Sequence, residues 1–261
     1  MKHMLSIQIA PKLQDSDAAQ QLRQQFSADT ADMIPEAEDS LILRLDESGL
    51  SLLSEDQKLQ GDFTRLLPRL KPNNLAGELL VRAAKIKGAE APTAIDATAG
   101  LGEDSFLLAA SGFRVKLYER NPVIFALLRD ALQRASQIPE LALIAARMEL
   151  FHQDSITAME QAGEAPDVIL LDPMFPERQK SALVKKKLQM IQKLEIPCAN
   201  EASLLLAAMS AGPKKLIVKR PPKGPWLAEL KPDHSITGKA VRFDCFVSPR
   251  DRLEKFRQIL R

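Results

Sequence analysis

From about residue 75, the chain alternates short apolar segments rich in β-branched residues with longer helix-like segments. The strand-like segments are TAID (93–96), FRVKLYE (113–119), ELFHQD (149–154), DVILLD (167–172) and KKLIVKR (214–220). Strands separated by helical patterns predict βαβ units and a mostly parallel sheet. HSITGKAVRFDCFVS (234–248) adds two β-rich runs around a Gly-Lys turn, which indicate an antiparallel edge. The pattern therefore predicts an α/β fold.

Helix-like segments fill the gaps between these strands. One of them, residues 122–136, has Pro122 in its first turn, where proline is favoured. Glycines at 88 and 112 predict the ends of two others. The predicted helices span 76–88, 104–112, 122–136, a segment from Ser155, about 178–194, and 201–212.

Residues before this region follow another pattern. SIQIA (6–10) and SLILRLDESGLSLL (40–53) alternate like edge strands, and residues 15–26 read as a short helix capped at Asp15 or Ser16. LLPRLKPNN (66–74) is typical of a connector. We expect a small α+β domain over residues 1–72 and a larger domain over residues 73–261.

Composition excludes several classes of protein. With 45% hydrophobic and 27% charged residues, the chain can bury an ordinary core. It has no apolar run of the roughly 18 residues that a membrane span needs. Its two cysteines and three histidines lack metal-ligand spacing, so we expect no metal site and a reducing cytoplasm. The sequence does not predict an oligomeric state.

Charge is distributed unevenly along the chain. Residues 172–261 hold 19 basic and 9 acidic side chains, whereas residues 1–171 hold 17 basic and 25 acidic ones. Such asymmetry indicates a surface that faces a polyanion, although basic faces also occur on proteins that bind no nucleic acid.

The first candidate site is AIDATAGLGEDSF (94–106). A strand ends at Asp96, the chain turns through Gly100 and Gly102, and a helix begins near Glu103 and Asp104. Glycines permit close backbone approach, but a tight turn alone would also need them. The carboxylates disfavour a diphosphate at this helix start, so a ligand with a cationic amino group or a sulfonium centre fits better.

Acidic residues also follow the next three strands. Glu119 stands 23 residues after Asp96, a distance typical of a carboxylate that binds ribose hydroxyls. Arg120 beside it could line an adenine or pair with a nearby carboxylate. Asp154 could accept the adenine amine, while Ser155 could be an ordinary helix cap. Asp172 ends the fourth strand. Because α/β folds bind ligands at the carboxyl edge, these four strand ends predict one site.

DATAGLGED, YERNP, LLDPMFP and the following QKSALVKKK resemble the class I S-adenosylmethionine-dependent methyltransferases. More narrowly, they are similar to the bacterial ribosomal RNA small-subunit methyltransferase J family, over about residues 75–247. The resemblance implies a Rossmann-like fold with a seven-stranded sheet, S-adenosylmethionine as cofactor, and methylation of the exocyclic N2 of one guanosine in 16S rRNA. Glu103 and Met174 depart from the family's patterns.

The resemblance also implies roles for particular residues. Asp172-Pro173-Met174-Phe175 is similar to the tetrad of amino-directed methyltransferases: Asp172 and the Pro173 carbonyl would accept N–H bonds, and Phe175 would stack on the extruded base. The implied cofactor contacts are Glu103, Asp104, Glu119, Arg120, Asp154, Ser155 and Asp172, beside Asp96, Gly100 and Gly102 of the glycine loop. The expected RNA-phosphate contacts are Arg178, Lys180, Lys185, Lys186, Lys187, Lys219, Arg220 and Lys223.

Three other functions stay open on the sequence alone. An NAD(P)-dependent oxidoreductase would need a glycine near position 105, where Ser105 stands. A non-catalytic RNA-binding or ribosome-assembly factor could keep the fold without the chemistry. A DNA adenine methyltransferase shares the tetrad type, but no target-recognition insertion is evident. The basic run could also be no more than a solvated helix face.

Overall fold

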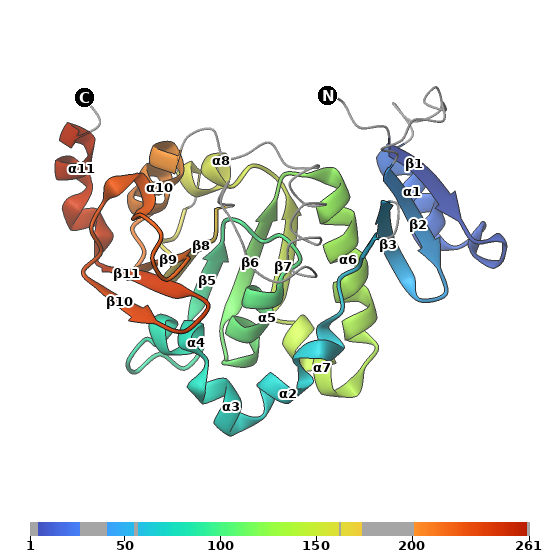
Figure 1. Cartoon of the computed structure of the whole chain (residues 1–261), viewed down its shortest axis with the longest axis horizontal. Coiled ribbons are helices and arrows are strands. Elements are labelled where there is room, and N and C mark those ends of the chain that lie inside the picture. The colour runs from blue at the N-terminus through green and yellow to red at the C-terminus, as the bar shows by residue number, and fades with distance from the viewer. Residues whose placement is uncertain (1–4, 27–40, 55–56, 162, 174–200, 260–261) are drawn as a thin grey trace.

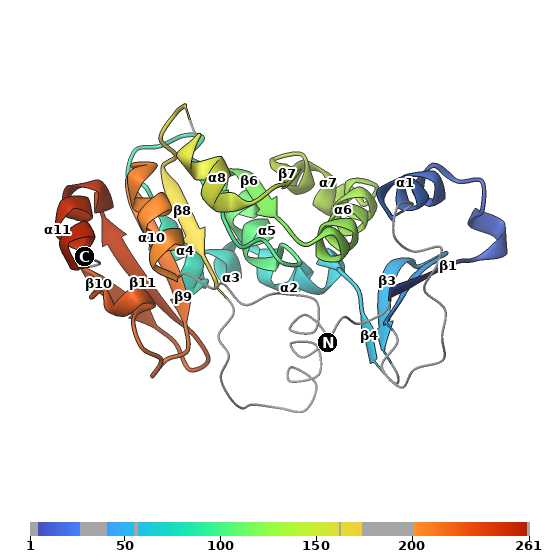
Figure 2. The same ribbon diagram turned by 90° about the horizontal axis from the view of Figure 1, so that it is seen from above.

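The computed structural model describes residues 5–26, 41–54, 57–161, 163–173 and 201–259. These residues form a four-stranded sheet near the N-terminus and a seven-stranded sheet in the rest of the chain (Figure 1). The four-stranded sheet lies beside α6 (Pro122–Ser136) at one end of the molecule. β10 (His234–Thr237) and β11 (Arg242–Val247) lie toward the other end (Figure 1 and Figure 2).

The seven-stranded sheet has the strand order β10-β11-β9-β8-β5-β6-β7. Its central strands are parallel to one another, and β11 runs antiparallel to both β9 and β10. This arrangement confirms the predicted α/β fold, in which a mostly parallel sheet carries an antiparallel edge. The parallel strands are β5 (Thr93–Asp96), β6 (Arg114–Glu119), β7 (Met148–His152), β8 (Val168–Leu171) and β9 (Lys215–Arg220).

Helices cover both faces of this sheet, because its buried strands are apolar on both sides. In β8, Leu170 belongs to the hydrophobic core beneath α5, whereas Leu171 belongs to the core beneath α10. α4 (Leu79–Ala84), α5 (Glu103–Ala110), α6 and α7 (Pro139–Ala145) pack on the first face, and α8 (Ser155–Glu160), α10 (Glu201–Ser210) and α11 (Leu253–Ile259) on the second. No helix within the described ranges is both long and apolar enough to span a bilayer.

The N-terminal sheet packs directly on the larger unit. β1 (Leu5–Ile9) pairs parallel with β2 (Leu41–Asp46), and β2, β3 (Gly49–Ser54) and β4 (Gln57–Leu59) follow antiparallel. α1 (Asp17–Phe26) begins after Ser16, whose hydroxyl accepts the Ala19 N–H at 3.2 Å. The sheet's apolar side chains share one core with those of α6. The domain boundary at residue 72 stays a prediction.

The predicted connector at 66–74 is largely helical. It contains the end of a 3-10 turn (Phe63–Leu66), then α2 (Leu67–Leu70) and the start of α3 (Pro72–Gly77). The prolines that suggested a loop stand in the first turns of α2 and α3, where a missing N–H costs nothing. Phe63 stacks on Phe106 of α5 with ring centroids 4.3 Å apart, which anchors this segment to the core.

Two other predicted helices need comment. The helix predicted at 76–88 is interrupted at Glu78, where ψ is 129°, and it ends at Ala84 instead of Gly88. Glu78 instead accepts two hydrogen bonds from Arg69, at 2.7 and 2.8 Å. The helix predicted over 178–194 lies outside the described residues. α7 was not anticipated from the sequence.

Candidate active site

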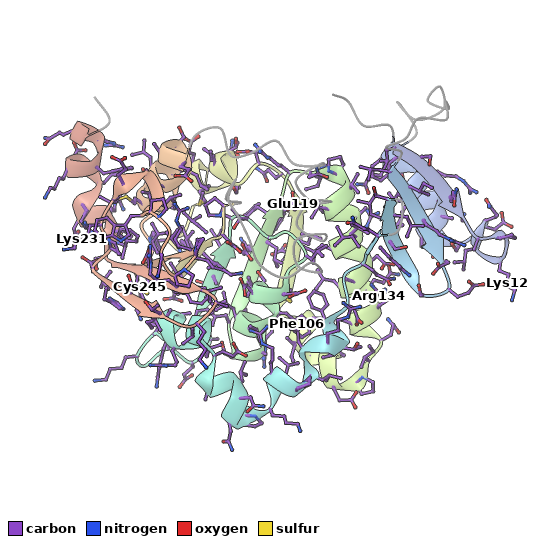
Figure 3. The ribbon with its side chains drawn as sticks, in the orientation of Figure 1. Lys12, Phe106, Glu119, Arg134, Lys231 and Cys245 are labelled. Carbon is purple, nitrogen blue, oxygen red and sulfur yellow. The ribbon has the colours of Figure 1, made fainter. Side chains whose placement is uncertain are left out.

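The carboxyl ends of the parallel strands bring the candidate residues to one edge of the sheet. Asp96 is level with Leu170, and Leu171 is level with Val218, so Asp172 and Lys219 continue side by side from β8 and β9. Side chains alternate along a strand, and Leu170 faces α5, so Asp172 and Lys219 emerge toward that same face. In Figure 3, Glu119 and Phe106 lie in the middle of the molecule, between the labelled Lys12 and Lys231 at its two ends.

The loop between β5 and α5 requires glycine at two positions. Gly100 has φ of +54° and Gly102 has φ of +76°, both in the left-handed region that glycine adopts at little cost. A Cβ on Gly102 would also lie 2.7 Å from Cδ1 of Leu128. Gly102 is the N-cap of α5 and has no side chain to cap it, and the first turn of the helix carries Glu103, which is exposed, and Asp104. This loop therefore combines close backbone approach with negative charge.

Asp96 is the most deeply buried carboxyl group of the site, with 2% of its surface exposed. Its Oδ1 accepts the Thr98 N–H at 3.1 Å, and its Oδ2 accepts the Ser105 hydroxyl at 2.6 Å. The pKa of Asp96 is raised to about 7, mainly by burial and also by nearby Asp104 and Asp172, while the two hydrogen bonds act in the opposite direction. Asp96 can therefore change its protonation state near neutral pH.

Glu119 links the end of β6 to the glycine loop. It is 5% exposed; its Oε2 accepts the Gly100 N–H at 3.1 Å and its Oε1 accepts the Asn121 N–H at 2.8 Å. A carboxylate oxygen can accept more than one donor, so these bonds to the backbone do not conflict with the predicted binding of ribose hydroxyls. Arg120 follows Glu119 and is exposed, and its carbonyl lies 3.2 Å from Nε2 of His152.

Asp154, not Ser155, caps α8. The Asp154 Oδ1 accepts the N–H groups of Ile156 and Thr157, at 3.0 and 3.2 Å. Ser155 is the first residue of the helix, so the capping role that the sequence offered for Ser155 is wrong. Asp154 also lies two residues beyond β7 instead of ending it. The cap explains why Asp is favoured here without any ligand, so a contact from Asp154 to adenine stays a prediction.

Asp172 follows β8 directly and is tied to the glycine loop through its backbone. Its N–H donates to Oγ1 of Thr98 at 2.6 Å, and Oδ2 lies 2.9 Å from Nζ of Lys219. The side chain keeps 40% of its surface exposed, yet desolvation of the carboxyl raises its pKa, and the Lys219 ammonium opposes that rise. Pro173 is buried. Phe175 and Met174 lie outside the described residues.

The structure describes three of the expected RNA-phosphate contacts, and these three have different surroundings. Lys219 is bonded within the site, to Asp104 at 2.6 Å and to Asp172, so its ammonium is not directed at an RNA surface. Arg220 is 2% exposed and donates to the Pro225 carbonyl at 2.9 Å. Burial therefore removes Arg220 from the expected phosphate contacts. Lys223 is exposed in the loop after β9, at the same edge of the sheet.

The other expected RNA contacts, Arg178, Lys180, Lys185, Lys186 and Lys187, lie outside the described residues. Two aromatic residues near these basic positions differ in exposure: Phe243, level with Lys219 in the sheet, is buried in the core, whereas Trp226, three residues after Lys223, is 40% exposed. The sequence alone did not identify Thr98 and Ser105 as site residues. Their hydroxyls stand two and nine positions after a strand-terminal aspartate, which is the signal that could have identified them.

The side chains gathered at this site fit a positively charged adenosyl ligand. Asp96, Asp104 and Asp172 gather near the first turn of α5, where Lys219 balances one of their charges, and a glycine loop leads into this turn. Carboxylates attract a sulfonium or ammonium group and repel a pyrophosphate. Ser105 is completely buried and bonded to Asp96, at the position where the dinucleotide fingerprint has its third glycine. These residues favour S-adenosylmethionine over a dinucleotide.

Comparison with known proteins agrees with this geometry. Residues 26–248 match the family described as "Putative SAM-dependent methyltransferase". The ribosomal RNA small subunit methyltransferase J of Thioalkalivibrio sulfidiphilus is 42% identical over 245 residues, which cover 88% of this chain and 96% of that protein. The protein of the same name from Aeromonas salmonicida is 45% identical over 172 residues, or 66% of this chain and 69% of that one.

A solved structure extends the likeness to the fold. The crystal structure of a SAM-dependent methyltransferase from Neisseria gonorrhoeae superposes with a TM-score of 0.73 at 30% identity. The match covers 93% of this chain and 96% of that one, so it includes the N-terminal sheet as well as the seven-stranded one.

Proposed function

The chain belongs to the ribosomal RNA small subunit methyltransferase J family of SAM-dependent methyltransferases, and from that premise we propose that it methylates the exocyclic N2 amine of a guanosine in 16S rRNA. The chain is an enzyme, and its cofactor is S-adenosylmethionine. We place its substrate, 16S rRNA or the assembling small subunit, in the cytoplasm.

One observation carries the assignment of the acceptor side. The Asp172 carboxyl follows β8 directly, beside β5 and its glycine loop, and its backbone is fixed by the Thr98 hydroxyl at 2.6 Å. Asp172 thus lies at the carboxyl edge of the sheet, beside the cofactor loop, which is where α/β folds bind ligands. The DPMF sequence that begins at Asp172 adds the tetrad expected of amino-directed transfer.

The chemistry asks little of the protein beyond positioning and electrostatics. A purine exocyclic amine is a poor nucleophile because its lone pair is delocalised into the ring. In our proposal, Asp172 and the Pro173 carbonyl accept its N–H bonds and turn the lone pair toward the reacting carbon. S-adenosylmethionine, when bound, supplies an electrophilic methyl group. Transfer would form the N–C bond, break the bond between the methyl carbon and sulfur and release the demethylated cofactor, and the amine proton that is lost would pass to the Asp172 carboxylate.

The cofactor side would be held by residues already grouped around the loop. Glu119 would accept the ribose hydroxyls, and Asp96 and Asp104 would face the positively charged end of the ligand. Phe175 would stack on the extruded guanine, and Arg178, Lys180, Lys185, Lys186, Lys187 and Lys223 would contact RNA phosphates. Phosphate contacts supply affinity and register, while the base pocket supplies the choice of nucleotide.

The test is methyl transfer from isotopically labelled S-adenosylmethionine to small subunits and to naked 16S rRNA, followed by nucleoside mass analysis. We expect label in N2-methylguanosine alone. Label in another nucleoside would replace the proposed acceptor, and incorporation into neither RNA would remove it. Calorimetry gives a separate check: S-adenosylmethionine and its demethylated product should bind, and NADH should not.

A further inference from the structure

Lys219 occupies an unexpected position for a residue in a basic segment. It is the last residue but one of β9, level with the start of the loop that follows β8. Its side chain retains 24% of its surface exposed, so most of the aliphatic stem is covered by protein. Its Nζ contacts two carboxylates from different elements: Oδ2 of Asp104 in α5 at 2.6 Å, and Oδ2 of Asp172 after β8 at 2.9 Å.

These two carboxylates belong to opposite halves of the site. Asp104 stands in the first turn of α5, which begins at the cofactor loop, while Asp172 begins the tetrad assigned to the acceptor amine. A lysine ammonium is a compact charge with three donors, so one side chain can serve both. The bridge therefore connects the donor half of the site to the acceptor half.

The charges around Asp172 show what the Lys219 ammonium contributes to the site. Asp104 and Asp96 face it from α5 and β5 and act as like charges, while Lys219 and Arg220 face it from β9 and stabilise its ionised form. Of the two cations, Lys219 has the larger effect on Asp172 and is in direct contact with it. Burial alone would lower the pKa of Lys219, but the two carboxylates outweigh it and raise that pKa, so the ammonium stays charged at neutral pH.

We propose that Lys219 is a positioning residue of the methyl-transfer site: by bridging Asp104 and Asp172 it keeps the Asp172 carboxylate ionised and aimed at the acceptor amine. The inference rests on the proposed function and adds a residue to it. Without the ammonium, two like charges would face each other. The Asp172 carboxyl would then take up a proton at a higher pH, which would remove an acceptor for the amine N–H.

The experiment compares Lys219→Met, Lys219→Gln and Lys219→Arg in single-turnover methyl transfer at saturating cofactor and RNA, between pH 5.5 and 8.5. We expect the rate of the unmodified enzyme to fall only at the acid end of this range, where Asp172 takes up a proton. In Lys219→Met and Lys219→Gln, the midpoint of that fall should move upward by about one pH unit or more, the effect typical of losing an adjacent opposite charge. Lys219→Arg should restore most of the original profile because it keeps the charge.

Two results would overturn the proposal. One is a rate that drops by the same factor at every pH in the Met and Gln variants, as a purely structural defect would give. The other is an unchanged profile in either variant. Two uncharged variants of different polarity are compared, so if one of them fails to fold, the other remains as the test. If neither folds, Lys219→Arg decides alone, and a displaced acid limb in that variant would contradict the proposal.

Failure of this proposal is distinguishable from failure of the proposed function. If the unmodified enzyme labels no guanosine N2, the acceptor assignment itself is at fault. If it does so and the substituted enzymes keep its pH profile, only the role of Lys219 is lost. Calorimetric binding of S-adenosylmethionine to each variant reports whether the cofactor half of the site is intact.

Discussion

The hydroxyl of Ser105 lies 2.6 Å from Oδ2 of Asp96, and both residues are buried. This contact joins the first turn of α5 to the end of β5. It occupies the position where a dinucleotide-binding loop would have a third glycine, so the helix start is used to hold a carboxyl group instead of a pyrophosphate. The protonation of that carboxyl is then linked to folding.

Asp96→Asn should change how stability depends on pH. The pKa of Asp96 is about 7 in the folded protein, against 3.8 for an aspartate in an unstructured peptide, which represents the unfolded chain. The folded state thus binds the proton more tightly, and stability from this group is lost as pH rises through 7. Over much of the range between these two pKa values, the free energy of unfolding of the ligand-free protein should fall by about 1.4 kcal/mol per pH unit relative to that of Asp96→Asn.

Urea denaturation of both proteins between pH 4 and 8 measures the difference between their free energies of unfolding, and this difference should level off above pH 7. Titrating groups remote from Asp96 cancel because they are common to the two proteins, whereas Asp104 and Asp172 interact with Asp96 and so contribute to the measured difference. Parallel stability curves over the whole interval would contradict the raised pKa.

Gly102→Ala should destabilise the protein more than Gly88→Ala. Both glycines have φ of +76°, so an alanine at either meets left-handed backbone strain of about 1–2 kcal/mol. At position 102 the added Cβ would lie 2.7 Å from Cδ1 of Leu128, whereas no atom of the described residues lies within 4 Å of a Cβ added at position 88. Overpacking should add about 1–3 kcal/mol.

Thermal unfolding measures both variants, and calorimetry should show weaker S-adenosylmethionine binding for Gly102→Ala alone. Equal destabilisation of the two variants would mean that the core beside Leu128 yields without cost.

Asp172→Asn should lower the methyl-transfer rate by about 100-fold or more, the usual scale for a group that handles a proton in the transition state. Asp167→Asn is the matched control, because Asp167 precedes the same strand at its opposite end and pairs with Lys214 at 2.7 Å. The control should lose stability and keep the rate. Single-turnover kinetics distinguish them, and similar rates in the two variants would count against Asp172.

Lys223→Ala should weaken RNA binding and reduce its salt dependence. One lost phosphate contact lowers the slope of log K against log salt by about 0.7–0.9. Lys87→Ala is the control, since Lys87 is also exposed but lies in the loop before β5, at the amino edge of the sheet. Filter binding across salt concentrations measures both slopes. Equal slopes would mean that Lys223 is an ordinary solvated side chain that contacts no RNA phosphate.

The sequence predicted three strand ends well, because each apolar run stops at an acidic residue: Asp96, Glu119 or Asp172. The parallel topology followed from the βαβ alternation, and the shared edge followed from the topology. Pro122 likewise marked the start of α6 correctly. These features depend on local signals that the fold does not override.

Other features depend on tertiary contacts and could not be read locally. A lysine in a basic run looks like a surface charge, and only the register of β8 against β9 shows that Lys219 meets Asp172. Prolines in 66–74 resemble loop residues until Phe63 is seen to anchor that segment to Phe106. Asp154 and Ser155 are both good caps, and backbone geometry decides between them.

The most direct test of the central claim is nucleoside mass mapping of 16S rRNA from a strain that lacks this chain. We expect a single N2-methylguanosine to be missing, to return with the unmodified gene, and to stay missing with Asp172→Ala. A complete set of methylated guanosines in the deletion strain, or full restoration by Asp172→Ala, would contradict an enzyme that steers a guanine amine onto its cofactor through that carboxylate.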